Sequence, residues 1–164
     1  MLFRSGKGAE TRTTSLFLGR EQQQFDLSTS ARHKAPMTRS SLLTKGVLAA
    51  KAKALSRGLI SIAENAGQSS GYEHQDTLLL SEQAEADAIP DLEIHNNDVR
   101  CTHGTAVGHL DEDQRHYLMT RGLSREEATR LMVEGYFDEV LQELPPNLKS
   151  TIAPALQSVV EEVL

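Results

Sequence analysis

Cys101 and His103 are the two side chains of this sequence best suited to bind a metal ion. Thiolate and imidazole are both good ligands for iron. The residues lie two positions apart in a run that favours a strand, so both side chains leave the same face. The structural alternative stays open at this point, because a lone cysteine is often packed in the core and a lone histidine near a turn is usually structural.

The same spacing argues against a catalytic pair. Two positions apart on a strand, Cys101 and His103 stand roughly 6–7 Å apart and point in parallel rather than at each other. Gly6-Lys7-Gly8 lacks the first glycine and the Ser/Thr of a phosphate-binding loop. There is no G-x-S-x-G element and no recognisable acid/base pair of carboxylates. We therefore expect a protein that is not an enzyme.

Composition indicates a folded chain of one domain, or of a domain with an appendage. The 164 residues are 38% apolar and 24% charged, and the single cysteine cannot form an internal disulfide. No apolar run approaches the ~20 residues of a membrane span. We expect no membrane association and a cytoplasmic location, or a plastid or other organelle in a eukaryote.

Charge divides the chain into two halves. Residues 1–57 carry 11 Lys/Arg and 3 Asp/Glu, whereas residues 58–164 carry 6 and 20. A basic half can bind nucleic acid, but these cations are scattered. A solvated basic face, or a surface for an acidic partner, is the preferred interpretation, and no nucleic-acid partner is expected.

The region from Leu16 to about Val107 favours strands. Short apolar runs such as 59–62, 77–80 and 92–94 are separated by turn residues, with too little chain for crossover helices. This pattern predicts an all-β arrangement, either a sandwich or a coiled solenoid. Residues 47–57 are ambiguous, because their composition favours a helix ending at Gly58 while the alternation of Ala and Lys favours a strand.

From Asp111 onward the pattern is helical. Asp111 is a candidate N-cap for a helix that ends at Arg121-Gly122, and Ser124-Arg-Glu-Glu127 is a capping box. An apolar stripe of helical spacing follows, made of Ala128, Leu131, Met132, Tyr136, Val140 and Leu144. Pro145-Pro146 ends that helix, and a last helix is expected from about residue 148 or 154 to 164.

Several short motifs occur in a fixed order. Residues 90–94 read P-D-L-E-I, and residues 98–108 read D-V-R-C-T-H-G-T-A-V-G. L-L-L-S at 78–81, H-x-x-P-x-T-x-S from His33 and K-G-V from Lys45 precede them, and D-E, Y-L, R-G and E-A follow between Asp111 and Ala128. Together they resemble the SufB/SufD family of iron–sulfur cluster assembly proteins, in its SufD version, over about residues 30–144. His116 stands where that family carries Phe.

The resemblance implies a right-handed parallel β-helix over residues 1–110, followed by a small α-helical domain over 111–164. It also decides the ambiguous segment in favour of a strand over residues 47–56. Members of the family usually have several hundred residues, so the match corresponds to their C-terminal part, with only the C-terminal coils of the β-helix.

The resemblance further implies a transient iron–sulfur cluster or iron, shared with a SufB-like subunit, and binding to a SufC-like ATPase through the helices. His103 is then the first ligand candidate and Cys101 the second, with Glu93 and His95 as weak candidates for a supporting role. A cluster typically needs about four protein ligands, so a single cysteine implies ligands borrowed from the partner.

The candidate ATPase-binding residues lie in the helical region and are Arg121, Gly122, Glu127, Leu131 and Tyr136. The first hypothesis is a scaffold subunit without its own turnover. The second is a shortened adaptor that only binds the ATPase, and a remote third is a thiol enzyme acting through Cys101.

Overall fold

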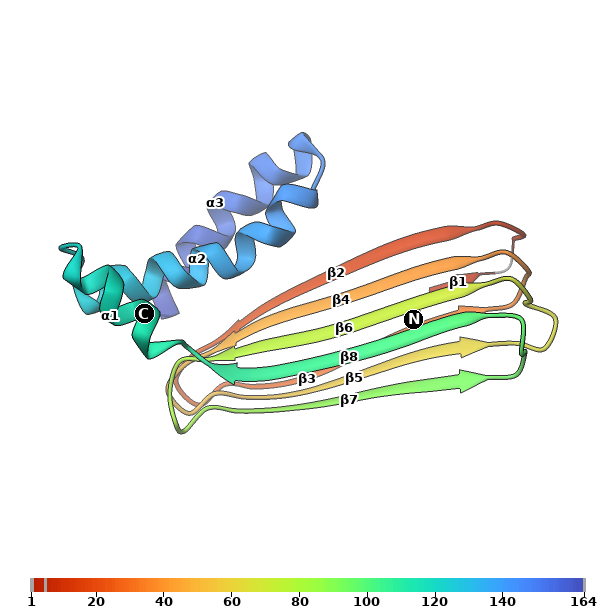
Figure 1. Ribbon diagram of the computed structural model, residues 1–164, viewed down its shortest axis with the longest axis horizontal. Coiled ribbons are helices and arrows are strands. Elements are labelled where there is room, and N and C mark those ends of the chain that lie inside the picture. The colour runs from red at the N-terminus through yellow and green to blue at the C-terminus, as the bar shows by residue number, and fades with distance from the viewer. Residues whose placement is uncertain (1, 5, 164) are drawn as a thin grey trace.

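The structure, a computed structural model, describes residues 2–4 and 6–163. The chain winds into a coil of parallel strands and ends in three helices (Figure 1). We call the strands the solenoid and the helices the helical unit. The strands are β1 (Leu2–Arg4), β2 (Glu10–Gly19), β3 (Gln24–His33), β4 (Arg39–Leu48), β5 (Lys53–Ile62), β6 (Ser70–Leu79), β7 (Glu85–Ile94) and β8 (Arg100–His109). The helices are α1 (Glu112–Thr120), α2 (Arg125–Glu143) and α3 (Pro146–Val163).

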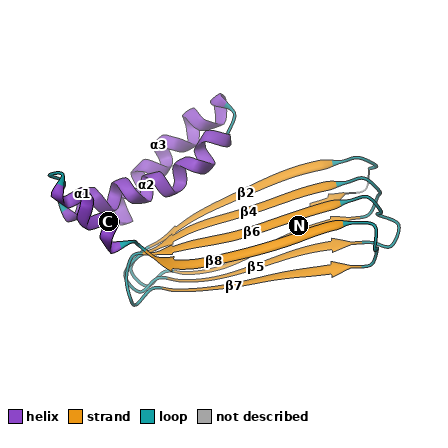
Figure 2. Ribbon diagram, viewed as in Figure 1, coloured by secondary structure: helices purple, strands orange, loops and turns teal. Residues whose placement is uncertain are grey.

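Successive strands belong alternately to two sheets. One sheet has the order β1-β3-β5-β7 and the other the order β2-β4-β6-β8, and every pairing is parallel. Strands β2 to β8 all have 10 residues and lie side by side along their full length (Figure 2). The predicted fold class, a parallel β-helix followed by helices, is therefore confirmed.

The corners between strands repeat the same backbone conformation. Gly8, Met37 and Gln68 have φ values of 73°, 62° and 57° at one corner, and Glu21 and Ala50 both have φ of 53° at the other. Such left-handed residues reverse the chain over a short distance, at a modest steric cost for residues other than glycine.

The predicted strand over residues 47–56 is wrong, because this segment contains a corner. β4 ends at Leu48, Ala50 takes the left-handed conformation, and β5 begins at Lys53. Ala50 and Lys51 are both exposed at this corner, and the alternation of buried Ala and exposed Lys holds only from Ala52 into β5. The other predicted runs, 59–62, 77–80 and 92–94, do lie in β5, β6 and β7, apart from Leu80, which follows the end of β6.

Along the direction of the strands, the interior of the solenoid has one apolar cluster near each end of the strands and polar side chains between the two clusters. One apolar group surrounds Leu48 and Leu79, and the other surrounds Leu42 and Ile60. The buried polar residues between or beside them include Thr44, Ser56, Glu73, Gln75 and Thr77. Burying a polar group costs free energy unless the group is hydrogen-bonded. The side chains of this polar layer therefore need specific hydrogen-bond partners, which the side chains of the two apolar clusters do not.

The helix boundaries follow their caps. Asp111 accepts hydrogen bonds from the backbone N–H groups of Asp113 and Gln114, as predicted for α1. α1 ends at Thr120 with Arg121 as its C-cap, and Gly122 follows with φ of 101°. The predicted capping box of α2 is also confirmed, with Glu127 N donating to Ser124 Oγ over 3.1 Å and Ser124 N to Glu127 Oε2 over 2.7 Å. α3 begins earlier than expected, at Pro146, and Leu164 lies outside the described residues.

The helical unit packs on the outer face of the sheet that contains β4. Val47 of β4 lies in one buried cluster with Val133 and Phe137 of α2 and Val160 of α3. The buried row of α2 is Ala128, Thr129, Val133, Phe137, Val140 and Leu141. The predicted stripe is therefore wrong at Leu131, whose side chain is 48% exposed. The helix is rotated from the predicted orientation, because Phe137, which the stripe omitted, is fully buried at the contact with the sheet and Tyr136 packs half-buried beside it.

Candidate functional site

The structure places Cys101 and His103 on β8, the last strand of the solenoid. Their pairing partners on β6 are Gly71 and Glu73, both of which face the interior. Cys101 and His103 therefore face inward as well, on the same face, as the spacing predicted. Among the described strands, β8 has a neighbour only on the β6 side. The two side chains consequently lie at an open end of the solenoid.

Cys101 is half-buried against the apolar group around Ile60. It lies above Gly71, where an added Cβ would come within 3.4 Å of the Cys101 Sγ. Burial raises the pKa of the Cys101 thiol, and a hydrogen bond from the Gly71 backbone acts in the opposite direction. The thiol is therefore protonated at neutral pH, and metal binding at Cys101 has to displace that proton.

His103 is exposed and lies next to Glu73 in the sheet. Glu73 is 1% exposed, and its carboxylate accepts a hydrogen bond from Gln75 Nε2 over 2.8 Å. Burial raises the pKa of Glu73, while the Gln75 hydrogen bond and the charge of His103 lower it. The buried carboxyl group of Glu73 thus lies next to His103, the first ligand candidate, on the strand one coil earlier in the chain.

Sequence reasoning missed Glu73. The run Tyr72-Glu73-His74-Gln75-Asp76 is polar on both faces of β6, so it contains no alternation that would mark an inward residue. The only sequence signal is Gly58, which pairs with Pro90 on β7 and faces the interior. A Cβ at Gly58 would lie 1.3 Å from Glu73 Oε1, so the carboxyl group occupies the space that this glycine leaves.

Two oxygens of this polar layer have no hydrogen-bond partner among the described residues, Glu73 Oε2 and Gln75 Oε1. A proton on Glu73 would supply one of the missing donors, in keeping with the direction of its pKa. No group of three or more His, Cys, Asp or Glu residues that could hold a metal occurs in residues 2–4 and 6–163. Cys101 and His103 therefore provide donors of the right chemistry for iron but not a complete ligand set.

The other histidines have different surroundings. His33 is buried, and its Nδ1 and Nε2 lie 2.7 Å from Thr38 Oγ1 and 2.8 Å from Ser40 Oγ. Thr38 Oγ1 in turn lies 2.9 Å from Ser69 Oγ. The H-x-x-P-x-T-x-S motif is therefore a hydrogen-bonded corner of the solenoid. His95 Nε2 lies 3.1 Å from Glu93 Oε1, and Glu93 alternates with inward-facing residues of β7, so this pair faces away from the interior.

The five candidate partner-binding residues fall into two groups. Arg121, Gly122 and Glu127 are exposed around the α1–α2 turn, where Arg121 donates to Tyr117 Oη over 3.0 Å. Leu131 is exposed on α2, whereas Tyr136 is half-buried toward the sheet, with Lys45 Nζ 4.5 Å from its ring centre. Tyr136 thus serves the internal contact of the helical unit, and a partner role for any of the five stays a prediction.

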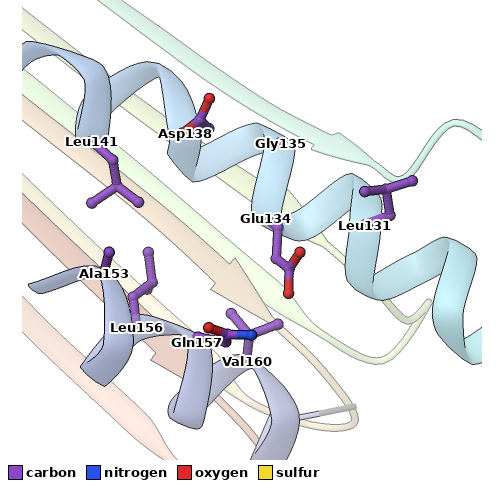
Figure 3. Close-up of a pocket in the computed structure, with 9 residues that line it drawn as sticks. All are labelled: Leu131, Glu134, Gly135, Asp138, Leu141, Ala153, Leu156, Gln157 and Val160. Atoms are coloured by element: carbon purple, nitrogen blue, oxygen red, sulfur yellow. The ribbon is translucent and has the colours of Figure 1, made fainter.

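A groove of about 380 Å³ lies between α2 and α3 (Figure 3). Leu131, Leu141, Leu156 and Val160 form its apolar lining, and Glu134 and Asp138 add carboxylates from α2. Leu131 joins this groove, and not the core as its helical spacing had suggested. The helical spacing had marked Leu131 as part of an apolar stripe. Whether its side chain faces the sheet or the groove depends on how α2 is rotated against the sheet.

Comparison with known proteins identifies the family to which the chain belongs. Residues 2–136 match the family model described as "SUF system FeS cluster assembly, SufBD core domain". The chain therefore belongs to the SufBD family, as the motifs indicated.

Among its curated relatives is an iron–sulfur cluster assembly SufBD family protein of Staphylococcus epidermidis, 33% identical over 140 residues. Relatives from Staphylococcus haemolyticus and Staphylococcus aureus are 35% identical over the same length. Each alignment covers 85% of this chain and 30% of the relative. The chain thus spans about a third of the length of these proteins.

None of the helices in the described part of the chain has the length and apolar character that crossing a membrane requires.

Proposed function

We propose that the chain is a scaffold subunit of iron–sulfur cluster assembly that resembles SufD and has no turnover of its own. In this role it pairs with a SufB-like subunit at the open end of the solenoid and with a SufC-like ATPase through the helical unit. Iron or a nascent cluster is its cargo and is held transiently. Membership of the SufBD family supports the assembly role.

One observation carries this proposal. Cys101 and His103 face inward on a strand that has no neighbour on its outer side among the described strands. A partner docking there would cover both donors and add its own ligands. A site completed in this way needs only two donors from this chain, whose sequence has a single cysteine and whose described residues form no group of three possible ligands.

The second candidate function is an adaptor that binds only the ATPase. The exposed α1–α2 turn and the exposed Leu131 at the groove favour it, because neither belongs to the cluster that packs on the solenoid. The adaptor does not require Cys101 or His103. The two functions therefore differ in whether iron accompanies the complex.

The test is anaerobic co-purification of the chain with SufB-like and SufC-like partners from the same source, measuring subunit stoichiometry and bound iron together. For the scaffold we expect a complex of all three chains with iron, and loss of most of the iron on His103→Ala with the stoichiometry unchanged. His116→Ala is the matched control, because His116 is exposed on α1, in the helical unit, whereas His103 lies on a strand of the solenoid.

A complex with the ATPase alone, without iron and indifferent to His103→Ala and Cys101→Ser, would favour the adaptor. Failure to bind either partner would reject both functions. A thiol-dependent turnover of the isolated chain that disappears with Cys101→Ser would contradict the expectation that it is not an enzyme.

A further inference from the structure

His103 is less firmly held than Cys101, the other donor of the candidate site. Cys101 packs against the apolar group around Ile60. The side chain of His103 is exposed and forms no hydrogen bond or ion pair with another described residue. Its imidazole can therefore rotate and can carry its proton on either ring nitrogen. A histidine that binds a metal needs one orientation and one tautomer, which a hydrogen bond from its second ring nitrogen usually provides.

Glu73 is the neighbour of His103 that can accept such a hydrogen bond. The two residues are register partners on β6 and β8, and both side chains face the interior. Paired strands lie about 4.8 Å apart, so the two side chains stand next to each other, one coil apart. Burial raises the pKa of Glu73, whereas the hydrogen bond from Gln75 and the charge of His103 lower it. His103 is therefore within electrostatic range of the carboxyl group.

One oxygen of this carboxyl group is available. Glu73 Oε1 accepts a hydrogen bond from Gln75 Nε2 over 2.8 Å, while Glu73 Oε2 is buried without a hydrogen-bond partner among the described residues. The register partner of Glu73 on β4 is Leu42, which has no polar side-chain group. On the opposite sheet the carboxyl group lies against Gly58, which has no side chain. Of these neighbours, only His103 carries a side-chain donor that is not already used.

A purely structural role would not require a carboxyl group at position 73. A glutamine there would keep a hydrogen bond with Gln75 and would avoid burying an ionisable group. Glu73 is 1% exposed, so its burial costs free energy. The carboxyl group also occupies space that a Cβ at residue 58 would fill. This cost is accounted for if Glu73 Oε2 gains a donor when the metal site is in use.

We propose that Glu73 is a positioning residue for His103. Glu73 Oε2 accepts a hydrogen bond from the ring nitrogen of His103 that does not bind the metal, and this bond fixes the tautomer of the imidazole. Because Glu73 lies one coil earlier than His103, the other ring nitrogen then turns toward the open end of the solenoid. Glu73 itself does not touch the metal. This inference rests on the proposed function for the role of His103 as a ligand.

The test is an NMR titration of the whole 164-residue chain, isotopically labelled at the nitrogens of its histidine rings, with Zn²⁺ as a diamagnetic probe in place of Fe²⁺. The spectra report, for each histidine, which ring nitrogen carries the proton and which binds the metal. We expect Zn²⁺ to bind one ring nitrogen of His103. The proton on its other ring nitrogen should exchange slowly with water, because the buried carboxyl group of Glu73 accepts it.

Glu73→Met removes the acceptor with little change in size. It should weaken Zn²⁺ binding at His103 by about tenfold or more and abolish the slow exchange of the ring proton. Glu73→Gln keeps an oxygen acceptor without the charge, so it should restore part of both properties, and it carries the test if Glu73→Met does not fold. Thr77→Val is the matched control, because Thr77 is a buried polar residue on the same face of β6. It should change neither property.

Two results separate this inference from the proposed function. Zn²⁺ binding and proton exchange at His103 that are unchanged by the Glu73 substitutions, or changed as much by Thr77→Val, would overturn the inference and leave His103 as a ligand. No response of His103 to Zn²⁺ in the unmodified chain would contradict its role as a ligand, and with it both the proposed function and the inference.

Discussion

Gly46 and Gly58 in the solenoid leave space that side chains of other strands fill, whereas Gly135 in the helical unit faces open space. A Cβ at Gly58 would lie 1.3 Å from Glu73, and one at Gly46 would lie 2.0 Å from Phe17. A Cβ at Gly135 would meet no atom within 4 Å. The solenoid therefore depends on contacts between residues about 15 to 30 positions apart, while the helices are defined mainly by caps within a few residues.

The difference matters for how each region tolerates change. Close packing around a polar layer leaves the solenoid little freedom to adjust. Among the described residues, the contacts of the helical unit with the sheet include the apolar cluster around Val47, the ion pairs Arg12–Glu143 and Lys45–Glu139, and the contact of Lys45 with Tyr136. Four substitutions, each with a control substitution, test this comparison, from the largest expected effect to the smallest.

Gly58→Ala should lower the free energy of unfolding by about 3 kcal/mol, because the new methyl group occupies the place of the Glu73 carboxyl group. Chemical denaturation measures the change. Adding Glu73→Ala should recover part of the loss, since it removes the clash. Gly135→Ala is the matched control and should instead stabilise by up to about 1 kcal/mol, as expected for Ala in place of Gly in a helix. Equal effects at the two glycines would refute the comparison.

His33→Ala should cost about 2 kcal/mol, because it leaves the buried hydroxyl groups of Thr38 and Ser40 without their imidazole partner. Thermal unfolding gives the measurement. His116→Ala, at an exposed position of α1, should change stability by less than about 0.5 kcal/mol. A His33 variant as stable as the His116 variant would show that the corner does not depend on this network.

Glu139→Gln should cost about 1 kcal/mol, because the buried Lys45 would lose the negative charge of its 2.6 Å partner while keeping its hydrogen bond to Tyr136 O. The Lys45 contact lowers the pKa of Glu139. The stabilisation that this ion pair contributes is therefore present at pH values above the ordinary pKa of the carboxyl group, and it is lost as pH falls through the lowered pKa of Glu139. Unfolding measured between pH 7 and pH 3 should show this loss in the unmodified chain and not in the variant.

Glu143→Gln provides the comparison for that ion pair. Glu143 pairs with Arg12 over 3.0 Å, but both side chains are more than half exposed. Its loss should be hardly measurable, as is usual for exposed pairs. A larger effect at Glu143 than at Glu139 would mean that burial of Lys45 does not determine the strength of the helix–sheet contact.

Ser124→Ala should lower stability by about 0.5 to 1 kcal/mol through loss of the N-cap of α2. The loss should appear as faster amide hydrogen exchange in the first turn of α2, with the solenoid unchanged. Ser150→Ala, within α3, is the control. Exchange that also increased in β4 and β6 would indicate that the helical unit and the solenoid unfold together.

The sequence by itself determined the elements whose signals are local. The caps at Asp111 and Ser124 specified where α1 and α2 begin, because a side chain there satisfies backbone donors within three residues. The short apolar runs at 59–62 and 92–94, with turn residues between them, predicted strands. The ordered motifs identified the family, and the spacing of Cys101 and His103 placed both on one face of β8.

Only the tertiary structure decided the corner at Ala50, the orientation of α2 and the presence of Glu73 behind His103. Each depends on residues from a different coil or helix, and a single strand or turn carries no information about that neighbour. Ala50 lies in a composition that suits helix, strand or turn, and the stacking of the coils selects the turn. Glu73 is one polar residue among several until Gly58, on the opposite sheet, provides the space that admits its carboxyl group.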